Sequence, residues 1–199
     1  MPVDIKYGII ILAAGNSSRL GRPKQLLPYH NKSLLRNAVE QSLVVPECIV
    51  MVVTGASRKI VESELNTDHI LIRYNGDWQT GMASSIKTGV SELLLLHPSL
   101  DALLITVCDQ PFLNAGIMNS LIAEHTSTNK PIIASAYNDT AGTPALFSKK
   151  YFNALQELAG QEGAKKIIMN HPEDTASVNF PPGGIDIDTD EDYRNLLKK

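Results

Sequence analysis

Cysteine is scarce in this chain of 199 residues, as are long apolar runs. The two cysteines, Cys48 and Cys108, lie in apolar, strand-like segments and lack the spacing of a zinc site. We expect both to be buried and reduced, as in a cytosolic protein, with no support for a disulfide. No apolar run approaches the roughly 20 residues of a membrane span. Asp4 and Lys6 precede the first short run and do not fit a secretory signal, so we expect a cytoplasmic protein without membrane contact.

The chain also lacks an excess of basic charge. Eighteen Lys and Arg against 21 Asp and Glu give a net charge of −3, and no basic tract stands out. This balance argues against a nucleic-acid polymer as partner, although a few cations gathered at one site could still bind a nucleotide. The length fits one domain, residues 1–199, large enough to bury a real core.

Short apolar runs alternate with helical periodicity along the chain. The predicted strands are 7–13, 48–54, 70–74, 102–107, 132–136, 144–147 and 176–179. The predicted helices are 34–43, 58–65, 82–96, 115–126, 150–158, 163–169 and a terminal helix through Leu197 capped by Thr189. This alternation predicts an α/β fold with a mostly parallel sheet covered on both faces, in which 144–147 could run antiparallel. In such sheets, ligands bind at the carboxyl ends of the strands.

The most informative segment, residues 12–28, reads L-A-A-G-N-S-S-R-L-G-R-P-K-Q-L-L-P and follows the first predicted strand. It combines two glycines, two hydroxyls and two cations: Gly15, Gly21, Ser17, Ser18, Arg19 and Lys24. Free backbone N–H groups and fixed cations at a strand end favour a polyphosphate. The spacing matches neither the Walker loop nor G-x-G-x-x-G. An ordinary surface loop with a turn at Gly21 is the alternative interpretation.

Two acidic motifs are candidates for metal binding. Asp109 ends the predicted strand 102–107, where a carboxylate can share a hard cation such as Mg²⁺ with phosphate oxygens. An Asp near a proline also forms turns, which is the alternative. Asp186 and Asp188 alternate along an extended segment, so both carboxylates would lie on one face. A solvated helix start would explain the acids that follow them, but explains this pair less well.

Three further segments are candidates for contacts with substrates. Residues 81–86, G-M-A-S-S-I, open a helix whose N–H groups and hydroxyls suit a base or ribose, although a plain helix cap is the alternative. Residues 142–144, G-T-P, and 160–166, G-Q-E-G-A-K-K, are candidates for a second substrate. A helix start with two surface lysines would explain the latter equally well.

Residues 12–24 resemble the signature of the molybdenum-cofactor guanylyl- and cytidylyltransferase family, L-A-(A/G)-G-x-S-x-R-x-G-x-x-K. Ala14, where the guanylyl branch usually carries Gly, and the K-Q-L-L-P continuation resemble the cytidylyltransferase branch. Asp109 falls in a D-x-P motif similar to the family's. Residues 186–192 resemble its D-x-D-T-P-E-D motif, with Asp190 in place of the proline.

The resemblance continues, with substitutions, through the other motifs. Residues 81–86 are similar to the family's G-M-S-S-S-L, but Ala83 replaces the first serine and removes one hydroxyl. Residues 142–144 resemble G-x-P, and 160–165 resemble G-D-x-G-A-R with glutamine and lysine in place of Asp and Arg. Lysine stays cationic but lacks the planar fork that grips a phosphate.

The resemblance implies a three-layer, Rossmann-like nucleotidyltransferase fold that transfers CMP from CTP to the terminal phosphate of molybdenum cofactor and releases pyrophosphate. It implies Mg²⁺ or Mn²⁺ held by Asp109 and Asp188, with Asp186 close behind. In the implied catalytic set of Arg19, Lys24 and Asp109, Arg19 would hold the departing pyrophosphate and Lys24 would stabilise charge at the α-phosphate. The implied nucleotide-binding residues are Leu12, Ala13, Ala14, Gly15, Ser17, Ser18, Arg19, Lys24, Gly81, Met82, Ser84 and Ser85. The implied acceptor-binding residues are Gly142, Thr143, Pro144, Gly163, Ala164 and Lys165.

Other functions stay open at this point. The nucleotide could be GTP or another triphosphate, and the acceptor could be a sugar phosphate, although the short length argues mildly against that. A carrier that hands molybdenum cofactor to a dehydrogenase without catalysis is a further alternative, against which the two intact acidic motifs argue. A molybdenum hydroxylase would be the client enzyme, and we expect a monomer or a weak homo-oligomer.

Overall fold

Apolar runs of Ile, Leu and Val form the centre of one sheet in the computed structural model, which describes residues 6–65 and 68–198; Asp4 lies outside them. The sheet contains β1 (Tyr7–Ala13), β4 (Cys48–Thr54), β5 (Leu71–Tyr74), β6 (Ala102–Val107), β7 (Ile132–Tyr137), β8 (Thr140–Ser148) and β9 (Thr175–Asn179). Their spatial order is β5-β4-β1-β6-β8-β7-β9. β8 runs antiparallel to both of its neighbours, and the other pairs are parallel. The predicted, mostly parallel sheet is thus confirmed.

The central strands are apolar without alternation because both of their faces are covered. Ile10 of β1 pairs with Met51 of β4 and Ile105 of β6, and all three are fully buried. The neighbouring positions Ile9 and Leu104 point to the opposite face and belong to a second cluster. One continuous apolar run therefore supplies two separate halves of the core.

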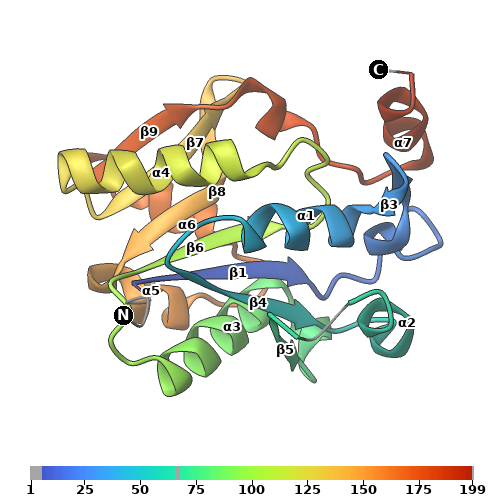
Figure 1. Ribbon diagram of the computed structural model, residues 1–199, viewed down its shortest axis with the longest axis horizontal. Helices are drawn as coiled ribbons and strands as arrows, with labels where there is room; N and C mark the ends of the chain where they lie inside the picture. The colour runs from blue at the N-terminus through green and yellow to red at the C-terminus, as the bar shows by residue number, and fades with distance from the viewer. Residues whose placement is uncertain (1–5, 66–67, 199) are drawn as a thin grey trace.

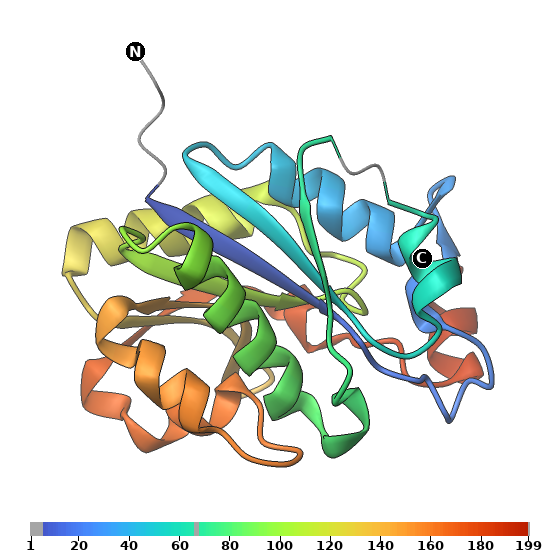
Figure 2. The same ribbon diagram turned by 90° about the horizontal axis from the view of Figure 1, so that it is seen from below.

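Helices cover both faces of the sheet, as expected. They are α1 (Leu34–Leu43), α2 (Arg58–Glu62), α3 (Met82–Leu96), α4 (Ala115–Thr128), α5 (Phe152–Glu157), α6 (Ala164–Asn170) and α7 (Asp190–Leu196). α1 and α4 lie on one face (Figure 1), whereas α3, α5 and α6 lie on the other (Figure 2). The result is the three-layer, Rossmann-like architecture predicted from the sequence.

Several local predictions need correction. The helix predicted at 58–65 ends at Glu62, and the helix predicted at 150–158 begins as the 3₁₀ turn η3 (Lys149–Tyr151) before α5. An unpredicted 3₁₀ turn, η1 (Lys24–Leu26), and a hairpin of β2 (Pro28–Tyr29) and β3 (Lys32–Ser33) precede α1. Its turn residues, His30 and Asn31, both have positive φ, as a tight hairpin requires.

The two thiols are free, but only one is fully buried. Cys108 is 3% exposed, as predicted, whereas Cys48 is only half-buried because it begins β4 at the rim of the core. The expectation that Cys48 is buried was therefore wrong. In the described part of the chain, no helix has both the length and the apolar surface needed to cross a bilayer.

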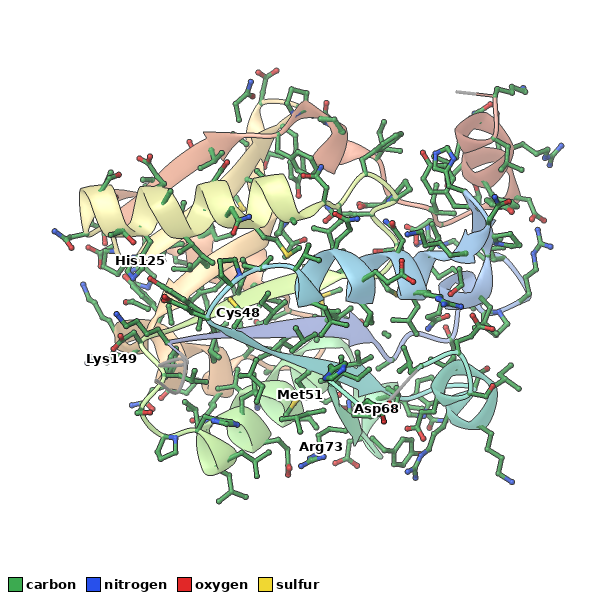
Figure 3. All side chains as sticks on the ribbon, viewed as in Figure 1. Cys48, Met51, Asp68, Arg73, His125 and Lys149 are labelled. Atoms are coloured by element: carbon green, nitrogen blue, oxygen red, sulfur yellow. The ribbon has the colours of Figure 1, made fainter. Side chains whose placement is uncertain are left out.

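The carboxyl ends of the parallel strands define one end of the molecule. In Figure 1, β1 points toward the end where β3 and α7 lie. Lys149 and His125, labelled in Figure 3, lie at the opposite end, where β1 begins. Segments far apart in sequence therefore converge beyond the end of β1.

Candidate active site

The loop that follows β1 is held in shape by its own side chains. Gln25 is buried, and its Nε2 donates to the carbonyl oxygens of Ala13 and Gly15, both at 2.8 Å. The Lys24 backbone N–H donates to Ser17 Oγ at 2.9 Å, and Ser17 has a φ of 53°. A Cβ at Gly15 would meet nothing within 4 Å, so the loop backbone faces open space there. Ser17, expected to offer its hydroxyl to a ligand, instead uses it inside the loop.

Lys24 joins the two predicted acidic motifs. Its ammonium forms ion pairs with the carboxylates of Asp109 and of Asp188, the latter at 2.8 Å. Arg19 Nη2 contacts the other oxygen of Asp188, also at 2.8 Å. The predicted catalytic and metal-binding side chains are thus brought together from segments 164 residues apart.

Backbone contacts fix the late acidic segment against Asp109. The Ile187 N–H donates to the Asp109 carbonyl at 3.0 Å, and the Ile187 side chain is fully buried. α7 then begins with the predicted capping box, in which Thr189 and Asp192 bond to each other's backbone N–H. Asp192 Oδ2 also accepts from the Asp188 N–H at 3.2 Å. The carboxylates on either side of Ile187 are therefore held by an anchored segment.

The electrostatics separate Asp186 from the other two acids. Burial by itself would lower the pKa of Lys24, but Asp109 and Asp188 outweigh it and raise that pKa. Burial acts to raise the pKa of Asp188, and the contacts with Lys24 and Arg19 overcome it and lower that pKa. Asp186 forms no such ion pair with any residue that the structure describes: burial, and then the charges of Asp109 and Asp188, raise its pKa to about 6.

The donor set fits a divalent cation that is shared with a phosphate ligand. Asp109 Oδ1 is buried without a hydrogen-bond partner, while Oδ2 faces Lys24. Among residues 6–65 and 68–198, no three His, Cys, Asp or Glu side chains are grouped closely enough to enclose a metal. Mg²⁺ needs only one or two carboxylates when phosphate oxygens complete its shell. Asp109 and Asp188 meet that requirement, and Asp186 lines the same hollow as these two and lies near enough for both charges to act on it.

Two adjoining hollows open beside these groups, of about 570 and 270 Å³. Both are lined by Leu12, Gly15, Lys24, Met82 and Asp109. The smaller hollow adds other predicted nucleotide-binding residues: Ala13, Ala14, Gly81 and Ser85. The larger adds the remaining loop, acidic and acceptor candidates: Ser17, Ser18, Arg19, Asp186, Asp188, Gly142, Thr143, Gly163, Ala164 and Lys165.

Two predicted site residues do not line either hollow. Ser84 Oγ accepts from Asn75 Nδ2 and donates to the Gly81 carbonyl, both at 2.8 Å, which stabilises the start of α3. Pro144 is buried, and its carbonyl accepts from Ser135 Oγ at 2.7 Å. The Ser84 hydroxyl is therefore engaged in the helix start, and the Pro144 side chain is buried.

The start of α3 packs directly on the predicted acceptor loop. Gly81 has a φ of 121°, and a Cβ there would lie 2.1 Å from the Gly160 carbonyl oxygen. The Ala83 N–H donates to the same oxygen at 3.2 Å, so this N–H, expected to face a ligand, is already used. The contact places the predicted nucleotide and acceptor segments side by side.

Residues 9–175 match the model of the MobA-like NTP transferase domain. The chain belongs to this family. It is 29% identical to nicotine blue oxidoreductase from Paenarthrobacter nicotinovorans, over 94% of this chain and 95% of the relative. It is 28% identical to molybdenum cofactor cytidylyltransferase from Escherichia coli K12, over 92% of each chain.

A solved structure of Rv0371c from Mycobacterium tuberculosis has a TM-score of 0.86 and 26% identity, covering 98% of each chain. A structure of Rv0371c in complex with manganese has a TM-score of 0.81 and 23% identity, covering 98% of this chain and 99% of that one. The MobA-like chain described here is therefore a nucleotidyltransferase by family. The names of its relatives span two reaction classes, so membership alone does not fix the substrates.

Three polar residues of this MobA-like site, Gln25, Gln110 and Tyr137, received no role from the sequence, and a fourth, Gln161, was predicted only as part of the second-substrate segment 160–166. Gln25 shapes the loop, and Gln110 Nε2 bonds to the carbonyls of Thr143 and Gly183 at 3.0 and 2.8 Å. Tyr137 lines the larger hollow and Gln161 lines both. Tyr137 had a usable signal, because it directly follows the predicted strand 132–136. For Gln25 the usable signal was an amide side chain next to an apolar pair, as in K-Q-L-L-P.

Proposed function

We propose that this protein transfers CMP from CTP to the terminal phosphate of molybdenum cofactor and releases pyrophosphate. The observation that carries the proposal is the meeting of Asp109 and Asp188 at Lys24, beside a loop backbone that faces open space. Transfer at a phosphate needs positioning and charge neutralisation more than covalent chemistry. Similarity to the Escherichia coli cytidylyltransferase supports CTP and molybdenum cofactor as the substrates.

We infer that the two substrates bind in different hollows. The base and ribose of CTP would occupy the smaller hollow, beside Ala14 and Ser85, with the triphosphate near Lys24 and Arg19. The acceptor would enter the larger hollow along Gly142 to Lys165. Its terminal phosphate is already largely ionised near neutral pH, so the reaction needs no strong general base.

Each charged side chain has a distinct proposed role. Lys24 would stabilise the negative charge that builds at the α-phosphate, and Arg19 would hold the departing pyrophosphate. Asp109 and Asp188 would hold Mg²⁺ or Mn²⁺, which supplies charge neutralisation at the triphosphate when bound. The manganese complex of Rv0371c makes Mn²⁺ a natural alternative to Mg²⁺ in the assay.

A second candidate is an oxidoreductase, favoured by the similarity to nicotine blue oxidoreductase over nearly the whole chain. The clustering of Lys24 and Arg19 with two carboxylates argues for nucleotidyl transfer. Cations beside a loop backbone that a ligand can approach closely suit a triphosphate. An oxidoreductase would consume an electron donor and release no pyrophosphate. The two candidates therefore differ in their products.

The deciding experiment incubates the purified protein with molybdenum cofactor, Mg²⁺ or Mn²⁺, and each of CTP, GTP, ATP and UTP in turn. Pyrophosphate release and the nucleotide attached to the cofactor are both measured. We expect incorporation of CMP above that of the other nucleotides. Preferred use of GTP would refute the cytidylyl assignment, and binding of cofactor without pyrophosphate from any nucleotide would indicate a carrier.

A further inference from the structure

Tyr137 is the last residue of β7 and lies on the wall of the larger hollow. Three glycines make room for its side chain. A Cβ at Gly142 would lie 2.2 Å from the Tyr137 hydroxyl, one at Gly183 would lie 2.9 Å from Cδ1, and one at Gly184 would lie 3.3 Å from Cδ2. Real Cβ atoms essentially never lie as close as the first two distances, and the third would be a tight contact, so the three glycines form a socket for the ring that any larger residue would narrow. The ring is thus held with its hydroxyl beside Gly142.

The surroundings of this hydroxyl are polar and strongly constrained. The side chains of Thr143 and Gln110 approach it, and the charge of Asp186 acts on it. Gln110 is 3% exposed, and its Nε2 is committed to two backbone carbonyls. Its Oε1 is buried, and no described residue forms a hydrogen bond with it.

The charges nearby decide what class of ligand group belongs here. The cations suited to phosphates lie elsewhere on the wall, at Lys24, Arg19 and Lys165. A phosphate beside Asp186 would be repelled by the negative charge of its carboxylate. An uncharged group with both N–H donors and carbonyl or ring-nitrogen acceptors would suit the hydroxyls and the acidic side chain.

We propose that Tyr137 determines specificity for the acceptor, with its hydroxyl forming a hydrogen bond to the polar fused heterocycle of that substrate. This inference rests on the proposed function, since it takes the acceptor to be a phosphorylated pterin. Tyr137 positions the heterocyclic end of the acceptor, while the phosphate end extends toward Lys24. We expect no effect of Tyr137 on binding of the base and ribose, because Tyr137 does not line the smaller hollow.

The direct test is Tyr137→Phe, which removes the hydroxyl but keeps the ring in its socket. Equilibrium dialysis of molybdenum cofactor, followed by molybdenum analysis, measures the acceptor site without requiring turnover. We expect the dissociation constant for cofactor and its KM to rise about tenfold, the value of one hydrogen bond, with the KM for CTP unchanged. Tyr7→Phe is the matched control, because Tyr7 is the first residue of β1 and lies at the opposite end of the strands from the hollow.

A second variant tests the socket itself. Gly142→Ala would push a methyl group against the Tyr137 hydroxyl, and we expect the same acceptor-specific loss. The double variant Tyr137→Phe with Gly142→Ala should be no worse than the more affected single variant, because the clashing oxygen is gone.

The outcomes separate this inference from the proposed function. If wild-type protein binds cofactor and Tyr137→Phe weakens that binding, the inference stands even when no pyrophosphate is released and the transfer assignment fails. Unchanged cofactor binding in Tyr137→Phe overturns the inference even if wild-type protein transfers CMP. A wild-type protein that does not bind molybdenum cofactor at all overturns both.

Discussion

Replacing Lys24 with methionine tests the electrostatic centre of the site, because methionine fills similar space without the charge. In the wild-type protein one ammonium pairs with both Asp109 and Asp188. The variant leaves Asp109, which is 14% exposed, beside other acids without its counterion. We expect a less stable protein that a divalent cation can rescue.

The magnitude follows from how far each partner is buried. Breaking a fully buried ion pair costs about 3–5 kcal/mol. Asp188 is 37% exposed and keeps its contact with Arg19, so solvent and that contact reduce the loss to about 2 kcal/mol. For a protein of this size, such a loss lowers Tm by about 4–8 °C.

Thermal unfolding with and without Mg²⁺ measures the effect. A cation at a hundredfold excess over its Kd contributes about 2.7 kcal/mol, enough to offset the substitution. Wild-type protein should gain less, because the Lys24 ammonium already lies between the carboxylates. Activity should fall by about 10²–10³-fold, as for loss of a preorganised electrostatic contact.

Lys149→Met is the matched control, because Lys149 is 74% exposed and pairs loosely with Asp101 at the opposite end of the molecule (Figure 3). It should change neither Tm nor the response to Mg²⁺. Equal stabilisation of wild type and Lys24→Met by Mg²⁺ would refute the reasoning. So would near-full activity of Lys24→Met.

Other changes give independent checks. Gly81→Ala should lower the free energy of unfolding in urea by about 2–4 kcal/mol, because its methyl group would clash with the Gly160 carbonyl. The control Gly76→Ala, whose methyl group would make only ordinary contacts, should change that free energy little. Thr189→Ala should cost about 1 kcal/mol by loss of the α7 cap, and equal stability of variant and wild type would show that the capping box adds nothing. Burial, and then the charge of Asp109, raise the pKa of Cys108 to about 12. The stabilisation that comes from keeping this thiol protonated is therefore complete below the ordinary thiol pKa and is lost as the pH rises toward 12. The free energy of unfolding of Cys108→Ala should fall less steeply with pH over that range than that of the wild-type protein. An identical fall in both proteins would contradict this.

Local pattern predicted most of the sheet and helices. The apolar run of β1 was found with both its ends, because a strand covered on both faces leaves an unbroken signal. The capping box at Thr189 was also visible in the sequence, because both of its partners lie within four residues. By contrast, the β2–β3 hairpin is too short to show any periodicity.

The candidate site was only partly accessible to the same reasoning. Strand ends and acidic motifs identified Lys24, Asp109 and Asp188 as candidates, but no local pattern encodes that one ammonium would contact both carboxylates. The internal use of the Ser17 hydroxyl and the packing of Gly81 on Gly160 depend on tertiary contacts. Tyr137 directly follows the predicted strand 132–136, which was a usable signal, but the three glycines that surround its ring are brought together only by the fold.

The hydrogen bond from Ile187 to Asp109 has a consequence for how the protein matures. Every strand of the large sheet precedes residue 180, so the whole sheet lies before Asp188 in the order of synthesis. Until Asp188 is added, Lys24 has only one of its two acidic neighbours. A chain that ended after β9 would keep every strand of the sheet but lack both the Ile187 contact and the second carboxylate at Lys24, so the site is complete only when the last acidic segment is present.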